Sequence, residues 1–182
     1  MVEPGLPEKI VAIHERLSRA KTPHAFGGAL SLAYYAEPRA TIDIDLNVFV
    51  TPDDFELVAA ALAELGVQGR RGVEARVQRD GQCRLWWGRT PVDLYFSYDA
   101  LHEAMREGVR REPFADTTIP VLAPEHLVVC KALFNRPKDW LDIEQVIVGV
   151  DELDADEVSA WMDRIVGEDD PRTLRLHALI AS

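Results

Sequence analysis

Two aspartates separated by one residue, Asp43 and Asp45, are the first residues in this chain whose type and spacing suggest chemistry. Their segment, Thr41–Val50, alternates polar and apolar residues, which predicts a β-strand with both carboxylates and Asn47 on one face. Aspartate is disfavoured in strands, and like charges on one face repel each other. A divalent cation, Mg²⁺ (or Mn²⁺), binds carboxylate oxygens and would offset that cost. The alternative is an acidic strand edge that faces solvent.

A glycine pair, Gly27-Gly28, precedes the aspartates and separates a short predicted strand, His24–Phe26, from a predicted helix, Ala29–Ala36. Glycine lets a phosphate approach the backbone, and a helix N-terminus presents free N–H donors to an anion. Taken alone, the pair also fits a plain tight turn. Followed by a strand with two aspartates, it predicts a site for nucleotide phosphates.

Asp93 is the third candidate carboxylate, in a second apolar strand predicted over Pro91–Tyr98. If the two strands are neighbours, Asp93 joins Asp43 and Asp45 in one cluster. Such a cluster both ligates metal and deprotonates an attacking hydroxyl. Without that pairing, Asp93 is an ordinary acid near the end of a strand.

Lys131 is the only charged residue in the apolar helix segment 127–134. A buried ammonium needs a partner, and a triphosphate or the carboxylate of Asp142 meets that need. Alternatively, the lysine stem reaches along the surface to water. Lys138 stands four residues before Asp142, a spacing that also fits a surface ion pair. Asp139 stands near a helix start, where its charge is favourable in any case.

The elements that position these residues change character along the chain. Strands and helices alternate up to residue 122, and only helices are predicted beyond it. This order predicts an α+β fold, a mixed β-sheet flanked by helices, with a C-terminal helical layer or subdomain. We therefore expect a core of residues 1–122 and a helical part of residues 123–182. The predicted C-terminal helices are Pro124–Asn135, Pro137–Val148, Ala155–Val166 and Pro171–Ile180.

The remaining elements of the core follow from periodicity and turn signals. A β-hairpin is predicted with its turn near Asp80-Gly81. Its strands are Glu74–Asp80 and Gln82–Trp87. The other predicted elements are helices over Leu6–Ala20, Thr51–Leu65 and Leu101–Val109 and a strand over Thr117–Leu122.

Together, these motifs resemble the signature of the nucleotidyltransferase (polymerase β-like) fold and, more narrowly, the AbiEii-type toxin nucleotidyltransferases. The first block consists of Gly27-Gly28 and the run Arg39-x-Thr41-x-Asp43-Ile44-Asp45-Leu46. A second block resembles a helical motif of that family and consists of Pro124-Glu125-His126, Lys131, Arg136 and Lys138-Asp139-x-x-Asp142-Ile143. The resemblance spans residues 24–148. Fourteen residues separate Gly28 from Asp43, which is at the long end of the family's range.

The resemblance implies a metal-dependent enzyme that transfers a nucleotide from a nucleoside triphosphate (NTP) to a hydroxyl group. On this prediction, the metal ligands are Asp43, Asp45 and Asp93, and the catalytic residues are these three and Lys131. The predicted nucleotide-binding residues are Gly27, Gly28, Arg39, Thr41, Lys131 and Asp142.

The acceptor is not fixed by these residues. By resemblance, one acceptor is an RNA 3′ end such as that of tRNA, with the chain as the toxin of a toxin–antitoxin pair and an antitoxin protein as its partner. The alternatives are a small-molecule hydroxyl, a protein hydroxyl, or a non-catalytic nucleotide-binding module on the same fold.

Charge is distributed unevenly. The net charge is −11, and residues 137–170 hold twelve acidic and two basic residues, whereas residues 70–89 hold six arginines. In that arginine-rich stretch, Trp86 and Trp87 alternate to opposite faces, so at most one is free to stack on a base. The stretch is the first choice for an RNA-contacting surface, and plain packing of both rings is the alternative.

The chain shows no basic-then-apolar leader at its start and no apolar run near the ~20 residues that a membrane helix needs. The two cysteines, Cys83 and Cys130, lack metal-ligand spacing and are expected to be reduced. These features predict a cytoplasmic protein with no membrane partner.

Overall fold

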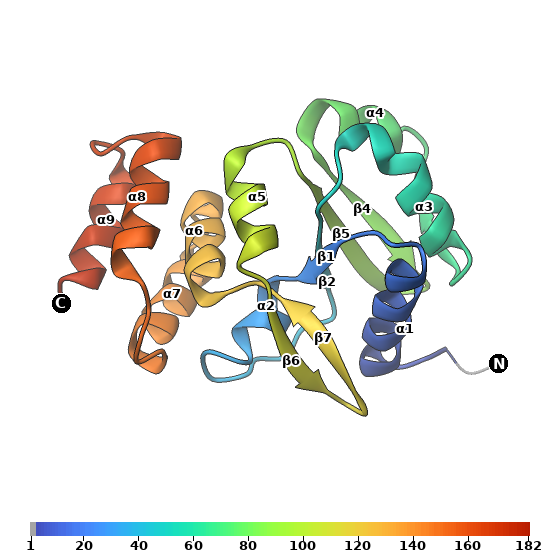
Figure 1. The fold of residues 1–182 in the computed structure, drawn as a ribbon, viewed down its shortest axis with the longest axis horizontal. Helices are drawn as coiled ribbons and strands as arrows, with labels where there is room; N and C mark the ends of the chain where they lie inside the picture. The colour runs from blue at the N-terminus through green and yellow to red at the C-terminus, as the bar shows by residue number, and fades with distance from the viewer. Residues whose placement is uncertain (1–2) are drawn as a thin grey trace.

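A seven-stranded mixed β-sheet forms the centre of the computed structural model, which describes residues 3–182 (Figure 1). The strand order is β3-β4-β5-β2-β1-β7-β6. The α+β class predicted from the order of elements is therefore confirmed. The strands are β1 His24–Phe26, β2 Ile44–Val48, β3 Val67–Gly69, β4 Gln82–Trp87, β5 Thr90–Phe96, β6 Arg110–Phe114 and β7 Thr117–Val121.

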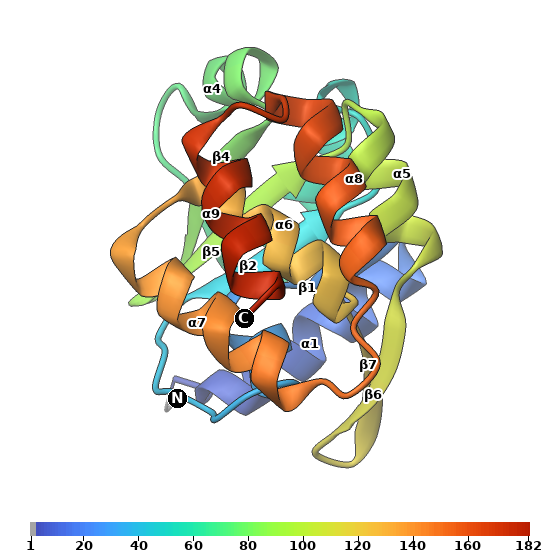
Figure 2. The same ribbon diagram turned by 90° about the vertical axis from the view of Figure 1, so that its left-hand side faces the viewer.

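Helices cover both faces of this sheet. In Figure 1, α1 and α3 lie on the side of the N-terminus, and α6 to α9 lie on the side of the C-terminus. Figure 2 shows α7, α8 and α9 grouped around α6. The helices are α1 Leu6–Arg19, α2 Gly28–Leu32, the 3-10 turn η1 Pro52–Asp54, α3 Phe55–Ala63, α4 Val73–Asp80, α5 Ala100–Glu107, α6 Pro124–Phe134, α7 Pro137–Gly149, α8 Ala155–Val166 and α9 Pro171–Ile180.

Two hydrophobic cores hold these layers together. The first joins α1 and α3 to the sheet through Ile13, Leu62 and the inward residues of β2 and β5. The second core joins the four helices α6, α7, α8 and α9 to one another and to Leu101 and Met105 of α5. Because α5 precedes residue 122 and shares the second core, the division into parts 1–122 and 123–182 stays a prediction.

The central strands bring the candidate carboxylates together. Strand β2 pairs parallel with β5, and Asp45 lies directly opposite Asp93. On the other side of β2, β1 runs antiparallel and ends at the glycine pair. Alternate residues of β2, Ile44, Leu46 and Val48, are buried in the first core, which turns Asp45 toward the opposite face.

The predicted hairpin of Glu74–Asp80 with Gln82–Trp87 is wrong, because its first strand is helix α4. Val73 and Val77 stand one helical turn apart, and Val77 is fully buried in the first core. Gly81, with φ of 66°, ends this helix in the left-handed conformation that favours glycine. The hairpin is instead β4–β5, which turns at Gly88.

Three further differences affect the site. The strand predicted over Thr41–Val50 is shorter, so Asp43 lies just before β2 rather than within it. The helix after the glycine pair ends at Leu32. Residues 37–43 then form an irregular segment, which accounts for the long spacing between the glycine pair and the aspartates. Strands β3 and β6 were not predicted.

Candidate functional site

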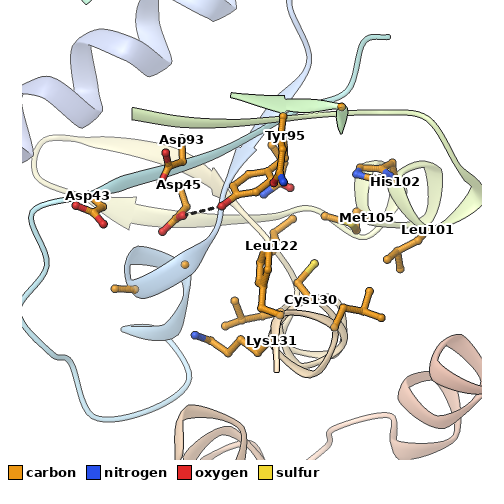
Figure 3. Close-up of a pocket in the computed structure, with 18 of the residues that line it drawn as sticks. Asp43, Asp45, Asp93, Tyr95, Leu101, His102, Met105, Leu122, Cys130 and Lys131 are labelled. Carbon is orange, nitrogen blue, oxygen red and sulfur yellow. Dashed lines mark hydrogen bonds between the residues drawn. The ribbon is translucent and has the colours of Figure 1, made fainter. Parts of the chain in front are cut away.

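A cavity of about 350 Å³ lies between the sheet and helices α5 and α6 (Figure 3). Its polar end is lined by seven of the nine predicted site residues. The other two, Gly27 and Asp142, lie directly behind lining residues, next to Gly28 and paired with Lys131, respectively. The seven lining residues are Gly28, Arg39, Thr41, Asp43, Asp45, Asp93 and Lys131.

Asp45 is a buried carboxyl of the cavity whose pKa is raised. Burial raises its pKa above the usual value of 3.8, and the negative charges of Asp93 and Asp43 raise it further. The Tyr95 hydroxyl donates a hydrogen bond of 3.4 Å to Asp45 Oδ1, which only partly offsets these effects. The positive charge of Lys131 also favours the ionised form but has the smallest effect, so a cation bound in the cavity would stabilise that form further.

Asp43 and Asp93 share a cation that the sequence analysis did not place at the site. Arg84 of β4 donates two hydrogen bonds to Asp93, of 2.7 and 2.6 Å, and its Nη2 lies 3.8 Å from Asp43 Oδ2. Arg84 lies directly opposite Asp93 across the β4–β5 ladder. Both charged residues were visible in the sequence, but the cross-strand register that places them opposite each other was not.

The donor set suits a hard divalent cation, since carboxylate oxygens are its preferred ligands. In residues 3–182, however, no three His, Cys, Asp or Glu side chains stand together in an arrangement that holds a metal ion. Arg84 donates to both oxygens of Asp93. Asp45 and the half-exposed Asp43 remain open to a metal ion.

The glycine pair packs closely against Asp45, where a larger residue would not fit. The Gly27 N–H donates to the Asp45 backbone carbonyl at 2.9 Å, which ties the start of α2 to β2. Gly28 has a φ of 55°, and a Cβ there would lie 1.8 Å from Asp45 Oδ2. Helix α2 has only five residues, so its dipole contributes little to anion binding. The main reason for a glycine at position 28 is therefore steric, because it leaves room for the Asp45 carboxylate.

We expect Gly28→Ala to reduce any activity of this site about 100-fold, because the methyl group must displace the Asp45 carboxylate by more than 1 Å. Backbone strain at positive φ should also lower the free energy of unfolding by about 1–2 kcal/mol. Gly72→Ala is the matched control, since Gly72 has a φ of 81° and nothing within 4 Å of an added Cβ. Urea unfolding should show similar backbone costs for both variants. Full activity in Gly28→Ala would contradict this account.

Lys131, Asp142 and Arg39 form an ion-pair network at the other wall of the cavity, in which Lys131 and Asp142 are buried and Arg39 is exposed. Lys131 Nζ donates to Asp142 Oδ2 at 2.6 Å, and the Arg39 guanidinium donates to both Asp142 oxygens at 3.3 and 3.2 Å. Only 4% of the Lys131 side chain is exposed, so the alternative in which it reaches water is wrong. Burial raises the Asp142 pKa, but the hydrogen bonds and charges of Lys131 and Arg39 outweigh this and lower it overall.

The ion pairs of helix α7 also decide between the alternatives given above for Asp142 and Asp139. Asp142 pairs with Lys131 and Arg39, not with Lys138 as the surface-pair alternative required. Asp139 is fully buried and accepts hydrogen bonds from Arg136, so it is more than a favourable charge at a helix start. Asp142 therefore holds two cations that line the cavity, and its own contact with a nucleotide stays a prediction.

Sequence reasoning also missed the apolar end of the cavity. Beyond Tyr95, the cavity continues beneath α5 and along α6, as Figure 3 shows. Its walls there are mostly hydrophobic, and in the sequence none of these residues can be distinguished from an ordinary residue of the hydrophobic core. The labelled members are Leu101, Met105, Leu122 and Cys130.

The two tryptophans have different surroundings. Trp87 packs against the first core, with Lys9 Nζ 5.6 Å from its ring centroid. Trp86 is stacked beneath two guanidinium groups, Arg70 at 5.2 Å and Arg84 at 5.9 Å. Contact between this surface and RNA stays a prediction. Across residues 3–182, none of the helices has the length and apolar character needed to span a membrane.

Comparison with known proteins identifies a family. The model of the family described as "Nucleotidyl transferase AbiEii toxin, Type IV TA system" matches residues 14–179. None of the curated protein sequences is similar enough to this chain to count as a relative.

Solved structures with the same fold include two of the antibiotic-resistance factor ANT(2'')-Ia. The solution structure has a TM-score of 0.63 at 18% identity and covers 97% of this chain and 98% of that chain. The crystal structure with adenylyl-2''-tobramycin has a TM-score of 0.64 at 13% identity and covers 94% and 97%, respectively. The lincosamide adenylyltransferase LnuA, bound to lincomycin, has a TM-score of 0.51 at 14% identity and covers 76% and 94%. These likenesses establish the fold.

Proposed function

The chain belongs to the AbiEii family of nucleotidyl transferases, and we propose that its three cavity aspartates serve metal-dependent transfer of a nucleotide from an NTP to a hydroxyl group. One observation carries this proposal. Asp45 and Asp93 lie in register on adjacent parallel strands, inside a cavity whose opposite wall holds Lys131. Such a cavity has negative charge for a metal ion and positive charge for a triphosphate.

Asp43 and Asp45 would hold the metal ion, Mg²⁺ or Mn²⁺. When bound, the ion supplies charge neutralisation on the triphosphate as the transfer proceeds. Asp93 accepts the proton of the acceptor hydroxyl, whose oxygen attacks the α-phosphorus in line while pyrophosphate leaves. We assign the phosphate contacts to Lys131 and Arg39 and to two smaller groups, the Thr41 hydroxyl and the backbone of Gly27-Gly28.

Catalysis of this kind is mostly positioning plus charge neutralisation, and the ion-pair network suits it. Asp142 fixes the side chains of Lys131 and Arg39, so neither cation loses much rotamer freedom when a phosphate binds. The intact set of Asp43, Asp45 and Asp93 argues against a module that binds nucleotides without transferring them.

The first acceptor that we propose is an RNA 3′ end, with tRNA as the leading candidate. The support is the family itself, which is described as the toxin of a type IV toxin–antitoxin system. An antitoxin protein would then be a partner of the chain. The compartment that we propose is the cytoplasm, where both NTPs and tRNA are found.

A small-molecule hydroxyl is the second candidate acceptor, and the apolar end of the cavity favours it. Side chains such as Met105, Leu122 and Cys130 form an enclosed wall next to the aspartates. Binding pockets for small molecules are concave, mostly apolar and about 300–1,000 Å³ in volume. An RNA terminus would leave much of that wall without contacts.

The two acceptors can be separated in one assay. The protein is incubated with Mg²⁺ and each NTP labelled at the α-phosphate, either with total tRNA or with a cell extract freed of macromolecules. We expect label in the tRNA fraction if RNA is the acceptor, or in a small-molecule product if the second candidate is right. In both cases Asp45→Asn should abolish labelling. Absence of any transferred label with all four NTPs would contradict the proposed function.

A further inference from the structure

Arg84 lies among the candidate metal ligands themselves. It binds both oxygens of Asp93 at 2.7 and 2.6 Å and also faces Asp43 Oδ2 at 3.8 Å. Its guanidinium stands 5.9 Å from the ring centroid of Trp86 on the same face of β4. Arg84 is therefore held from two sides, and its charge is directed at the carboxylate cluster.

This contact differs from an ordinary cross-strand ion pair. A surface pair needs one acid opposite one base, and such pairs contribute little to stability. Arg84 instead joins Asp93 of β5 to Asp43, which precedes β2 on the far side of β5. It also lines both the main cavity and a second hollow of about 260 Å³ that adjoins Asp93. The guanidinium thus bridges two acids at the boundary of two adjoining hollows.

The distribution of charge indicates what this bridge does. Three carboxylates carry three negative charges, and Arg84 neutralises one of them. The remaining charge equals that of one divalent cation, and Asp45, whose Oδ1 meets only the Tyr95 hydroxyl, is the carboxylate left without a cationic partner. A second divalent ion at Asp93 would have to displace a bidentate guanidinium, which is the strongest geometry for an arginine–carboxylate pair.

We propose that the Arg84 guanidinium takes the place of a second divalent cation on the Asp93 side of the site, so that the protein binds one metal ion per bound nucleotide. This inference rests on the proposed function, because it presupposes a metal-bound NTP at Asp43 and Asp45. Arg84 acts through Asp93 and is a positioning residue. It holds the Asp93 carboxylate in one orientation, aimed at the acceptor hydroxyl, and Asp93 retains free lone pairs to accept the proton.

The number of bound metal ions tests this inference without relying on activity. We would titrate Mn²⁺ into the protein saturated with the α,β-methylene analogue of an NTP, trying the ATP, GTP, CTP and UTP analogues in turn. Electron paramagnetic resonance reports the free Mn²⁺, and hence the bound ions per protein. We expect one ion in the wild type and two in Arg84→Gln, with the second site at least ~10-fold tighter than in the wild type, where Arg84 competes for it.

Arg79→Gln is the matched control, because Arg79 is exposed and pairs only with the neighbouring Asp80. It should bind one ion, as the wild type does. Arg84→Lys should also bind one ion if charge suffices, and it tests whether the bidentate geometry matters.

Two ions in the wild type would overturn the inference, and Asp45-dependent transfer of label in the same preparation would leave the proposed function standing. One ion in a folded Arg84→Gln variant would also overturn it. No bound ion in the wild type would refute the proposed metal site together with the inference. If Arg84→Gln fails to fold, the wild-type count still decides between one ion and two.

Discussion

Asp45→Asn is expected to reduce nucleotide transfer about 10³-fold or more and yet to leave the metal-free protein at least as stable as the wild type at pH 7. The loss of rate follows from removal of a proposed metal ligand, a change worth several kcal/mol in the barrier. The stability follows from the raised pKa of Asp45, since burial and the charges of Asp93 and Asp43 all disfavour its ionised form. Asparagine keeps the shape and removes that charge.

The sign of this effect depends on pH. The folded pKa of Asp45 lies above its usual value of 3.8. The contribution of this group to stability is therefore greatest below that value and is lost as pH rises through the folded pKa. Urea unfolding in metal-free buffer should show Asp45→Asn gaining relative to the wild type as the pH increases from about 3.5 to 7. Asp53→Asn, at an exposed position outside the cavity lining, should show no such trend. An Asp45→Asn protein clearly less stable than the wild type at pH 7 would refute the electrostatic argument.

The second large effect is expected at the buried pair of Lys131 and Asp142. Lys131→Met leaves Asp142 with only Arg39, and it should cost about 3–5 kcal/mol of unfolding free energy, the usual cost of removing one member of a buried ion pair. Asp142→Leu should also destabilise the protein, because it removes the hydrogen-bonded partner of the buried Lys131 ammonium and leaves Asp139 Oδ1, 3.9 Å away, as an ionic partner. The double variant should be much more stable than the sum of the two costs implies.

A measurement of transfer activity distinguishes the role of this pair in stability from the proposed role of Lys131 in binding the triphosphate. If Lys131 contacts the triphosphate, the double variant should recover stability but not transfer activity. A double-mutant cycle by urea unfolding, with the labelled-NTP assay on the same four proteins, measures both. Additive stability costs would show that the two side chains do not interact as the structure indicates. Full activity in the double variant would show that Lys131 has no role in nucleotide binding.

Local signals predicted the C-terminal helices well. Helices α8 and α9 begin at the predicted residues, and the side chains of Asp154 and Asp170 each accept a hydrogen bond from a backbone N–H of the first turn. Proline at the first position of α9 strengthens the same signal. Such caps depend only on neighbouring residues, so they can be recognised without knowledge of the fold.

The hairpin was misplaced because its turn signal was ambiguous. Asp80-Gly81 fits both a two-residue hairpin turn and a helix end with glycine in the left-handed conformation. The decision depends on Val77, which is buried in the first core only if residues 73–80 are helical. That contact is tertiary, but the segment also has a local preference for a helix, because five of its eight residues are Glu, Ala, Arg or Gln, which are strong helix formers.

The carboxylates of the site were predicted, and so were Lys131 and Arg39, but Arg84 was not. Asp43 and Asp45 are close in sequence, and a strand places them near each other whatever the fold. Arg84 reaches the cluster only through the β4–β5 register, and Asp142 reaches Lys131 only because α6 and α7 pack together. Long-range pairings of this kind depend on the completed fold. The pairing of Asp142 with Lys131 was one of two alternatives left open by the sequence, and the second partner of Asp142, Arg39, was not predicted.

The most direct test of the metal-dependent site is an anomalous diffraction experiment on crystals grown with Mn²⁺ and the α,β-methylene NTP analogue that binds. Data collected near the manganese edge locate the ion independently of any assumption about the reaction. We predict a single peak within bonding distance of Asp43 and Asp45, with the analogue's phosphates on the side of Lys131 and with Arg84 still bound to Asp93. A bound analogue with no manganese peak at these aspartates, or with its phosphates outside the cavity, would contradict the account.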